Sequence, residues 1–356
     1  MFMKQLATGA QNSSVTSDLL FRELASSGDG GPYSPDATHF TRSGAEPFPS
    51  ETRSPSGSRA LAQRLRRLLR SFYSRYLFSP SLVAWSKGQT DAKVAQLALQ
   101  QQYRNLARLG ADSLPKLREV GFRQYSQFEE DGILLYLFSI IAPETRTCLE
   151  LCAGTGIECN TANLIINHGW WGHLFDGDPD NVARGRAFYA RHKDTFLRPP
   201  NFNHAWITAE NVNQLVKDSG LRGPVDLLSL DMDGNDYWIW KALEIVEPTV
   251  VVCETHNTIP PDLALTIPYN PTFQLGTFED DFRGASLRAM CKLGRAKGYR
   301  LVGTHRYGFN AFFVKCGVAD DLLPEVTPEQ CCSDPYSRWA QATRWQTAKN
   351  RNWVEV

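Results

Sequence analysis

Acidic and imidazole side chains follow two apolar runs of this chain, where they could act on a bound ligand. Asp231 ends the run of residues 226–230, and Glu254-Thr-His256-Asn257 ends the run of residues 250–253. A carboxylate or a neutral imidazole can take the proton of a reacting hydroxyl group. We therefore expect Asp231 and His256 to be the catalytic residues.

The same positions offer ligands for a divalent cation. Asp231, Glu254 and Asn257 supply hard oxygen atoms, and His256 adds one nitrogen. A bound Mg²⁺ would make a substrate hydroxyl more acidic. The alternative is that Asp233 and Asp236 cap the next helix and that His256 hydrogen-bonds a loop. We expect no resident metal, and the three oxygen donors remain candidate ligands.

A glycine turn follows the apolar stretch of residues 147–151. Gly154 and Gly156 let the backbone approach a ligand, and the N-terminus of the following helix favours a carboxylate. Glu150 precedes the turn, and Asp176 and Asp178 end the next apolar stretch. An open α/β sheet holds an adenosine-bearing cofactor in this way, with one acid on the ribose hydroxyls. Either Asp176 or Asp178 could fill that position, or the Asp-Gly-Asp-Pro-Asp segment could form a turn and a helix cap.

The glycine spacing bears on the identity of the cofactor. A dinucleotide fingerprint has a third glycine three positions after Gly156, where this chain has Cys159. The spacing therefore gives little support to a pyrophosphate site. An NAD-dependent oxidoreductase is nevertheless the alternative enzyme class.

Seven apolar runs predict the strands that position these residues. Most are continuous rather than alternating, as in a parallel sheet covered on both faces. The last two are joined by a short glycine-containing turn, so they must be antiparallel. The predicted fold is α/β and Rossmann-like, a mostly parallel seven-stranded sheet closed by an antiparallel hairpin, with an N-terminal helical extension. The predicted strands are residues 147–151, 173–175, 204–208, 226–230, 250–253, 300–304 and 310–315.

Helix signals lie between and before these strands. Residues 91–109 form a periodic pattern with Val94, Leu97, Leu106 and Leu109 on one face. Ser126 and Glu129 have the spacing of a capping box. Further helices are predicted over residues 160–167, stopped by Gly169, and over residues 286–297.

Composition divides the chain into four parts. Residues 1–58 are rich in Ser, Gly, Pro and Thr and predict a disordered tail. Residues 59–119 form a basic and helical extension, residues 120–316 the α/β domain, and residues 317–356 a C-terminal extension whose role the sequence does not indicate. The 38 basic residues balance the 38 acidic ones, so net charge does not favour nucleic acid as a partner. No apolar run is long enough to span a membrane, and we expect a cytoplasmic protein.

Residues 59–77 form a basic amphipathic pattern in which arginines alternate with leucines and aromatic residues. Such a helix could lie on an anionic membrane surface or on a partner. It could equally pack against the domain with a solvated basic face.

Three motifs together resemble the FkbM-type methyltransferases over roughly residues 120–315. They are Tyr125-Ser-Gln-Phe-Glu-Glu-Asp-Gly132, residues 150–156, and Leu230-Asp-Met-Asp-Gly-Asn-Asp-Tyr-Trp238. The chain departs from that family at Cys152, where glycine is usual, and at Asp233 and Asp236, where glutamate is commoner.

The resemblance implies S-adenosyl-L-methionine (SAM) as cofactor. Glu150, Gly154 and Gly156 would line its methionine end, with Asp176 or Asp178 on the ribose. Ala209 and Glu210 would lie beside the adenine, and Asp231 would face the sulfonium or the acceptor.

The sequence therefore predicts a SAM-dependent methyltransferase that acts on a hydroxyl of a sugar or another secondary metabolite, a small-molecule acceptor. The long proline-rich segment of residues 257–281 is predicted to form an acceptor wall or lid. A third possibility is a non-catalytic protein with a methyltransferase-like fold that binds a membrane or a partner. The oligomeric state is not indicated.

Overall fold

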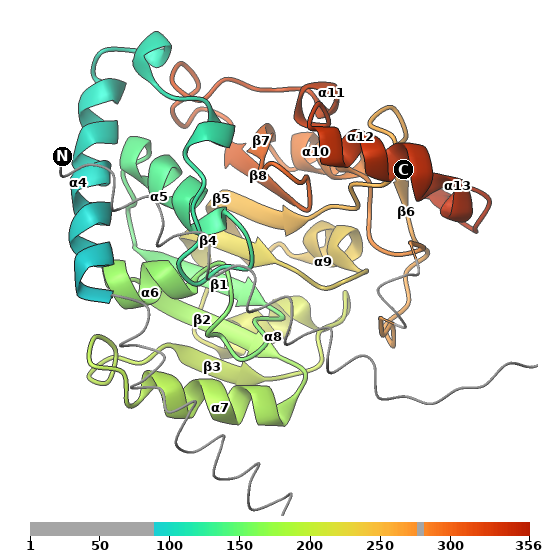
Figure 1. Cartoon of the computed structure of the whole chain (residues 1–356). Coiled ribbons are helices and arrows are strands. Elements are labelled where there is room, and N and C mark those ends of the chain that lie inside the picture. Colours follow the sequence, from blue (N-terminus) through green and yellow to red (C-terminus); the bar gives the residue numbers. More distant parts are fainter. Residues whose placement is uncertain (1–88, 276–280) are drawn as a thin grey trace, which may run out of the picture. The chain divides into compact units, whose positions relative to one another are not determined.

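The computed structural model describes residues 89–275 and 281–356. The predictions for the tail of residues 1–58 and for the basic helix of residues 59–77 lie outside these residues. The main sheet has seven strands in the order β3-β2-β1-β4-β5-β8-β7 (Figure 1). They are β1 (Thr147–Leu151), β2 (Trp171–Asp176), β3 (Asn201–His204), β4 (Gly223–Leu230), β5 (Val246–Glu254), β7 (Tyr299–Thr304) and β8 (Asn310–Lys315).

The strand directions confirm the predicted Rossmann-like fold. The first five strands are parallel, whereas β8 runs antiparallel to both β5 and β7. The strand order reverses between β1 and β4, because β2 follows β1 on one side and β4 lies on the other. Ligands of open α/β sheets bind at the carboxyl ends of the strands at such a point.

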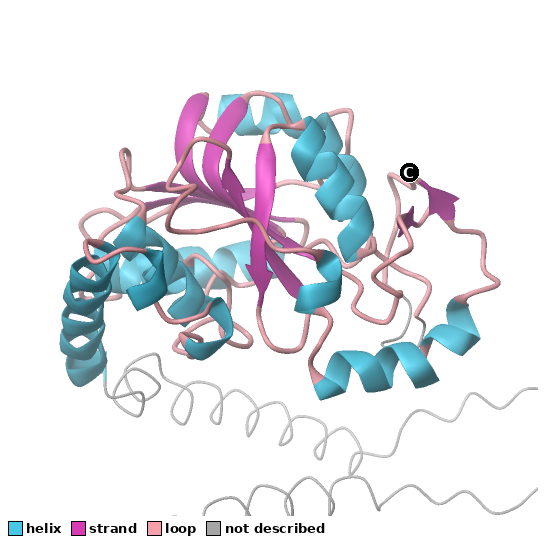
Figure 2. Ribbon diagram, turned by 90° about the horizontal axis from the view of Figure 1, so that it is seen from above, coloured by secondary structure: helices cyan, strands magenta, loops and turns pink. Residues whose placement is uncertain are grey.

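Helices cover both faces of the sheet (Figure 2). One core contains side chains of α5 (Glu130–Ile140), α6 (Ala162–His168) and α7 (Pro179–Tyr189). The other contains side chains of α8 (Val212–Asp218), α9 (Asp236–Ala242) and α10 (Leu287–Ala296). Neighbouring strand residues alternate between the two cores, so both faces of each strand are apolar.

The N-terminal extension is confirmed in part. Helix α4 (Gln89–Ala107) packs against α5, and two short 3₁₀ turns, η2 (Ala111–Ser113) and η3 (Leu117–Glu119), follow it. The predicted apolar face is wrong. Gln96 and Tyr103 are buried, whereas Val94 and Leu97 are 65% and 51% exposed. Gln96 donates to the buried Asn163 of α6, so a polar contact orients the helix.

Two other local predictions are corrected. Strand β3 ends at His204, which pairs with Asp176 at the end of β2. Residues 205–211 form a loop, so the predicted strand of residues 204–208 is wrong beyond His204. The capping box at Ser126 does not form, since helix α5 begins at Glu130. The Ser126 hydroxyl instead exchanges hydrogen bonds with Asp131.

The C-terminal extension contains α11 (Pro328–Cys331), α12 (Pro335–Thr343) and α13 (Trp345–Ala348). It ends in β9 (Val354–Glu355), which pairs with β6 (Leu265–Thr266) in a separate two-stranded sheet. Arg344 also donates two hydrogen bonds to Asp281. The end of the chain is thus fastened to the long segment after β5. Among the described helices, none combines the length and the apolar character needed to cross a bilayer.

Candidate functional site

A cavity of about 550 Å³ opens at the carboxyl ends of β1, β2, β4 and β5, where the strand order reverses. Small-molecule sites commonly fall in this size range and at this position in open α/β sheets. The lining residues are Gln127, Phe128, Glu150, Cys152, Ala153, Gly154, Glu158, Cys159, Asn160, Asp176, Asp231, Met232, Asp233, Glu254, Arg283, Phe309 and Asn310.

The cavity is strongly acidic. Six of its lining residues are aspartate or glutamate, and Arg283 is the basic one among them. Carboxylates gathered in a partly dry space favour a ligand that carries positive charge. Neutral or cationic ligands therefore fit this lining better than polyanions do.

Glu150 lies in the cavity wall, but its carboxylate is already occupied. It accepts hydrogen bonds from the backbone amides of Asn160 and Thr161 at 2.9 and 3.0 Å. The hydroxyls of Thr161 and Ser229 donate to it as well. Four donors fill the acceptor capacity of an ionised carboxylate. Glu150 thus closes the loop that leads into α6, and the amides before that helix are no longer open to an anion.

Gly154 and Asp176 meet at the centre of the predicted cofactor edge. Gly154 has φ +55°, and a Cβ at this position would touch nothing within 4 Å. Its amide donates to Oδ2 of Asp176 at 2.8 Å, while Asp178 N and Asn181 Nδ2 donate to Oδ1. A carboxylate accepts about four hydrogen bonds, so Asp176 retains room for about one ligand hydroxyl.

Four of the predicted cofactor residues lie outside the cavity lining, and Asp178 and Gly156 are two of them. Asp178 is exposed and caps α7, accepting from the amide of Asp180 at 2.8 Å. Gly156 has φ +67°, and a Cβ there would come within 2.9 Å of Phe202 and 3.0 Å of Leu174. Its missing side chain is therefore required by core packing.

Cys152 follows β1 in an unusual backbone conformation. Its backbone has φ +64°, a left-handed conformation that glycine adopts without a steric cost. A glycine would adopt this conformation freely, whereas the cysteine adopts it with some strain. Its side chain takes part in the cavity wall.

Three acids converge on one wall. Carboxylate oxygens of Asp231, Asp233 and Glu254 all lie within 4.8 Å of one another. Burial, together with the charges of Asp236 and Asp233, raises the pKa of Asp231 to about 8. Burial, with the charge of Asp231 next, also raises the pKa of Glu254. In the described part of the chain no hydrogen-bond donor reaches the Asp231 carboxylate, so it is open to a ligand.

Asp236 has a different role. It accepts from the amides of Met232 and Gly234 and so holds the turn that starts α9. Burial raises its pKa to about 6. Asp236 therefore has a structural role in the turn before α9, although it does not cap the helix, whereas Asp233 reaches the cavity.

His256 and Asn257 do not join the acids. The His256 ring is buried, and its Nε2 lies 2.7 Å from the backbone carbonyl of Asp281. Asn257 donates to the backbone carbonyl of Tyr307 at 2.7 Å. Neither residue lines the cavity, so these contacts suit the structural alternative. The predicted metal-binding set is thus not brought together: Asp233, and not Asn257, accompanies Asp231 and Glu254.

Ala209 and Glu210 bind the long segment after β5 and do not reach the cavity. The hydroxyl of Tyr269 accepts from the Ala209 amide at 2.9 Å and donates to Glu210 at 2.6 Å. Three further contacts hold the same segment, namely Trp206 Nε1 to the Pro271 carbonyl, Trp238 Nε1 to the Ile267 carbonyl and Asn235 Nδ2 to the Asn270 carbonyl. Residues 257–275 line none of the cavity. The described part of the predicted acceptor wall is instead hydrogen-bonded to neighbouring loops and to α9.

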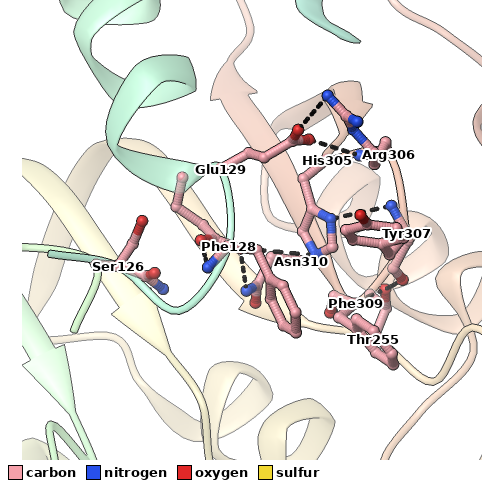
Figure 3. Close-up of polar contacts among 12 residues, drawn as sticks. Ser126, Phe128, Glu129, Thr255, His305, Arg306, Tyr307, Phe309 and Asn310 are labelled. Atoms are coloured by element: carbon pink, nitrogen blue, oxygen red, sulfur yellow. Dashed lines mark hydrogen bonds and ion pairs between the residues drawn. The ribbon is translucent and has the colours of Figure 1, made fainter. Parts of the chain in front are cut away.

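The site also contains a wall that the sequence analysis did not assign. Phe128 stacks on Phe309 and His305, with ring centroids 5.4 and 5.2 Å apart (Figure 3). Glu130 is fully buried and accepts from the Phe128 amide and from Asn310 Nδ2. These contacts join residues 128–130 to residues 305–310, and Asn310 lies 180 positions after Glu130. The Ser-Gln-Phe-Glu-Glu-Asp motif was the available signal.

Asp131 explains why that motif holds its shape. Its Oδ2 accepts from the backbone amides of Gln124, Tyr125 and Ser126 at 2.6, 2.5 and 2.8 Å. A Cβ at Gly132 would come within 2.3 Å of Phe122 N and Val120 O, so only glycine fits. The acid and the glycine of the motif thus fold the segment that brings Phe128 to the cavity.

A second cavity, of about 660 Å³, lies among residues 111–118, β7 and residues 322–335. Its lining combines apolar side chains with charges of both signs, and no strand-end carboxylate of the parallel sheet reaches it. The acidic cavity is therefore the candidate active site.

Comparisons with known proteins were made for the whole chain. No family model and no curated protein matches it. Similar solved structures include an O-methyltransferase family protein from Burkholderia thailandensis, at 15% identity and a TM-score of 0.31 over 48% of this chain and 50% of that one. The glycopeptide N-methyltransferase MtfA complexed with S-adenosyl-L-homocysteine matches at 12% identity and a TM-score of 0.34, over 55% of this chain and 93% of that one.

The CcbJ methyltransferase from Streptomyces caelestis matches at 15% identity and a TM-score of 0.32, over 51% of this chain and 87% of that one. The chain spans half the length of the Burkholderia protein. These matched structures are methyltransferases by name. Similarity at this level assigns no activity to the chain, and its fold rests on its own strand order and registers.

Proposed function

We propose that the chain is a SAM-dependent methyltransferase whose cofactor occupies the acidic cavity. The observation that carries the proposal is the six-carboxylate lining at the point where the strand order reverses. SAM carries a sulfonium and an ammonium group, so a lining of this sign fits it. When bound, the cofactor would supply an activated methyl group.

Particular residues support this assignment. Gly154 presents backbone without a side chain, and Asp176 beside it retains about one acceptor position for a ribose hydroxyl. Asp231 and Glu254 lie on the opposite side of the switch point, at the ends of β4 and β5. They would face the positively charged part of the ligand or the acceptor.

The acceptor is proposed to be a hydroxyl of a sugar or a related secondary metabolite. Transfer to a hydroxyl requires an in-line acceptor oxygen and the removal of its proton. Asp231 is the proposed base, since its pKa of about 8 lies near neutral pH. His256 is less suited, because its Nε2 is engaged with the Asp281 carbonyl.

The NAD-dependent alternative receives less support from the site. A dinucleotide places its pyrophosphate on free amides at the helix N-terminus after the first strand. In this chain the amides of Asn160 and Thr161, just before α6, donate to the Glu150 carboxylate. An anionic ligand would also meet the acidic lining.

Isothermal titration calorimetry with SAM, S-adenosylhomocysteine and NAD⁺ tests the proposal. We expect the two adenosyl ligands to bind and NAD⁺ not to bind. Asp231→Asn should retain the binding of S-adenosylhomocysteine but lose methyl transfer from labelled SAM to the hydroxyls of a sugar panel. Binding of NAD⁺ without binding of either adenosyl ligand would refute the assignment.

A further inference from the structure

An exposed apolar pair lies in the loop between α7 and β3. Phe196 is 54% exposed and Leu197 is 86% exposed, although large apolar side chains usually find cover. They are consecutive, so both project from one tip.

The loop presents this pair in a fixed way. The side chains of His192 and Thr195 are buried, and the Thr195 hydroxyl donates to the Tyr189 carbonyl at 2.7 Å. The amides of Phe196 and Arg198 donate to the His192 and Thr195 carbonyls. Residues 192 and 195 thus anchor the turn, and the apolar pair is held outward by it.

The end of α7 and the loop that follows it are rich in basic residues. Residues 184–198 contain five basic residues and one acid, although the whole chain is neutral. The basic side chains are exposed, and the guanidinium of Arg198 lies 4.8 Å from the ring centre of Trp171, which is itself 39% exposed. The basic residues are Arg184, Arg186, Arg191, Lys193 and Arg198.

Helix α4 extends the same surface. Lys93 forms an ion pair of 3.7 Å with Asp194, so the start of α4 lies beside the loop (Figure 1). The next residue, Val94, and then Leu97 are large apolar side chains of α4 that are exposed. Residues 59–77, which precede α4 in the sequence, form a basic amphipathic pattern.

We propose that this surface, formed by Phe196, Leu197, Val94, Leu97 and the basic residues around them, binds the face of an anionic lipid bilayer. Peripheral binding requires two contributions. Aliphatic and aromatic side chains insert below the headgroups, and lysine and arginine side chains lie beside anionic headgroups. Nucleic acid fits less well, since it would satisfy the charges but leave Leu197 in water.

This contact leaves the candidate active site free. The loop enters β3 at its amino end, whereas the acidic cavity lies at the carboxyl ends of the parallel strands. The two sites are therefore on opposite edges of the sheet. Membrane binding and cofactor binding should be separable, and the inference does not depend on the proposed methyl transfer.

Co-sedimentation of the full chain with vesicles tests the proposal. We expect binding to vesicles of phosphatidylcholine with phosphatidylserine, weak binding to phosphatidylcholine alone, and a decrease with added salt. The double variant Phe196→Ser/Leu197→Ser should bind these vesicles at least about tenfold more weakly, because the two apolar side chains that would insert into the bilayer are removed. Trp339→Ser removes a side chain of similar exposure (53%) from α12 and should bind as the wild type does.

Several results would overturn the proposal. Unchanged vesicle binding by the double variant would assign any membrane contact to another segment, such as residues 59–77. Equal binding to neutral vesicles would remove the role of charge. Binding of single-stranded RNA without binding of anionic vesicles would favour the other polyanion. Hydrogen exchange provides a second readout, because vesicles should protect the amides of residues 193–198 in the wild type. The double variant should have the melting temperature of the wild type, so a loss of binding would not reflect unfolding.

Discussion

The backbone amide of Gly154 donates a hydrogen bond of 2.8 Å to Oδ2 of Asp176, and this contact joins the loop after β1 to the end of β2. The two segments are the ones that the sequence assigned to one cofactor. Because the same carboxylate also accepts from Asp178 N and Asn181 Nδ2, it shapes the site as well as lining it.

Replacing Asp176 should weaken cofactor binding. Asp176→Asn retains the size but loses the charge and one acceptor oxygen, so we expect about tenfold weaker binding of S-adenosylhomocysteine by calorimetry. Asp178→Asn is the matched control, because Asp178 caps α7 in solvent and should leave affinity unchanged. Equal affinities of the wild type and Asp176→Asn would remove Asp176 from the site.

Replacing Glu150 should act mainly on stability. Four donors converge on its buried carboxylate, and Glu150→Gln would turn an amide NH₂ toward some of them. We expect the free energy of unfolding in urea to fall by about 2–4 kcal/mol. Glu158→Gln serves as the comparison, since its partner Arg123 and the acid itself are both exposed. A Glu150→Gln protein as stable as the wild type would contradict this account of the loop.

Cofactor affinity should rise with pH. Burial and the neighbouring acids raise the pKa of Asp231 to about 8, so this carboxyl is largely protonated at neutral pH without a ligand. A cationic ligand favours the ionised form, and its binding therefore releases a proton. Between pH 6.5 and 8.5 we expect the affinity of the wild type for SAM to rise about tenfold more than the affinity of Asp231→Asn does. Equal pH dependence of the SAM affinity in the wild type and in Asp231→Asn would show that ligand binding does not change the ionisation of Asp231.

The same shift has a consequence for the unliganded protein. A carboxyl with a raised pKa binds its proton more tightly when folded than when unfolded. That contribution to stability is lost as the pH rises through about 8. The free energy of unfolding in urea should therefore decline as the pH rises from the ordinary pKa of 3.8 toward about 8, and this decline should be smaller in Asp231→Asn.

The latch at Tyr269 should be measurable by hydrogen exchange. Tyr269→Phe removes the hydroxyl that accepts from the Ala209 amide and donates to Glu210. We expect the Ala209 amide to exchange several-fold faster, in keeping with one hydrogen bond of about 1 kcal/mol. Amides of β1 should not change in the same experiment. Unaltered exchange at Ala209 would show that the hydroxyl does not hold the segment.

Chelation tests the prediction that no metal is required. We expect the affinity for S-adenosylhomocysteine to be the same in EDTA and in excess Mg²⁺, since the expected histidine and asparagine ligands lie away from the acids. A loss of binding in EDTA that Mg²⁺ restores would contradict this expectation and would direct attention to Asp231, Asp233 and Glu254.

Local sequence signals were sufficient for most of the framework. Strands β1 and β8 begin and end where the apolar runs predict, and Gly169 ends α6 in a left-handed conformation. The prediction for β3 was wrong, because the apolar character of Ile207 marks a buried loop residue and not a strand. The face of α4 was wrong for a related reason: the periodicity of its leucines did not reveal that Gln96 and Tyr103 have buried partners.

The sequence by itself determined a doubly covered parallel sheet with its antiparallel closure, and it determined that acids end the strands at one edge. Those features follow from apolar runs, turn lengths and glycines, which act over a few residues. Only the tertiary structure decided which acids share the cavity. Asp233 turns inward from a left-handed backbone (φ +56°), while His256 and Asn257 are drawn away by the carbonyls of Asp281 and Tyr307. The direction of a loop side chain depends on partners distant in the chain, which short-range patterns do not encode.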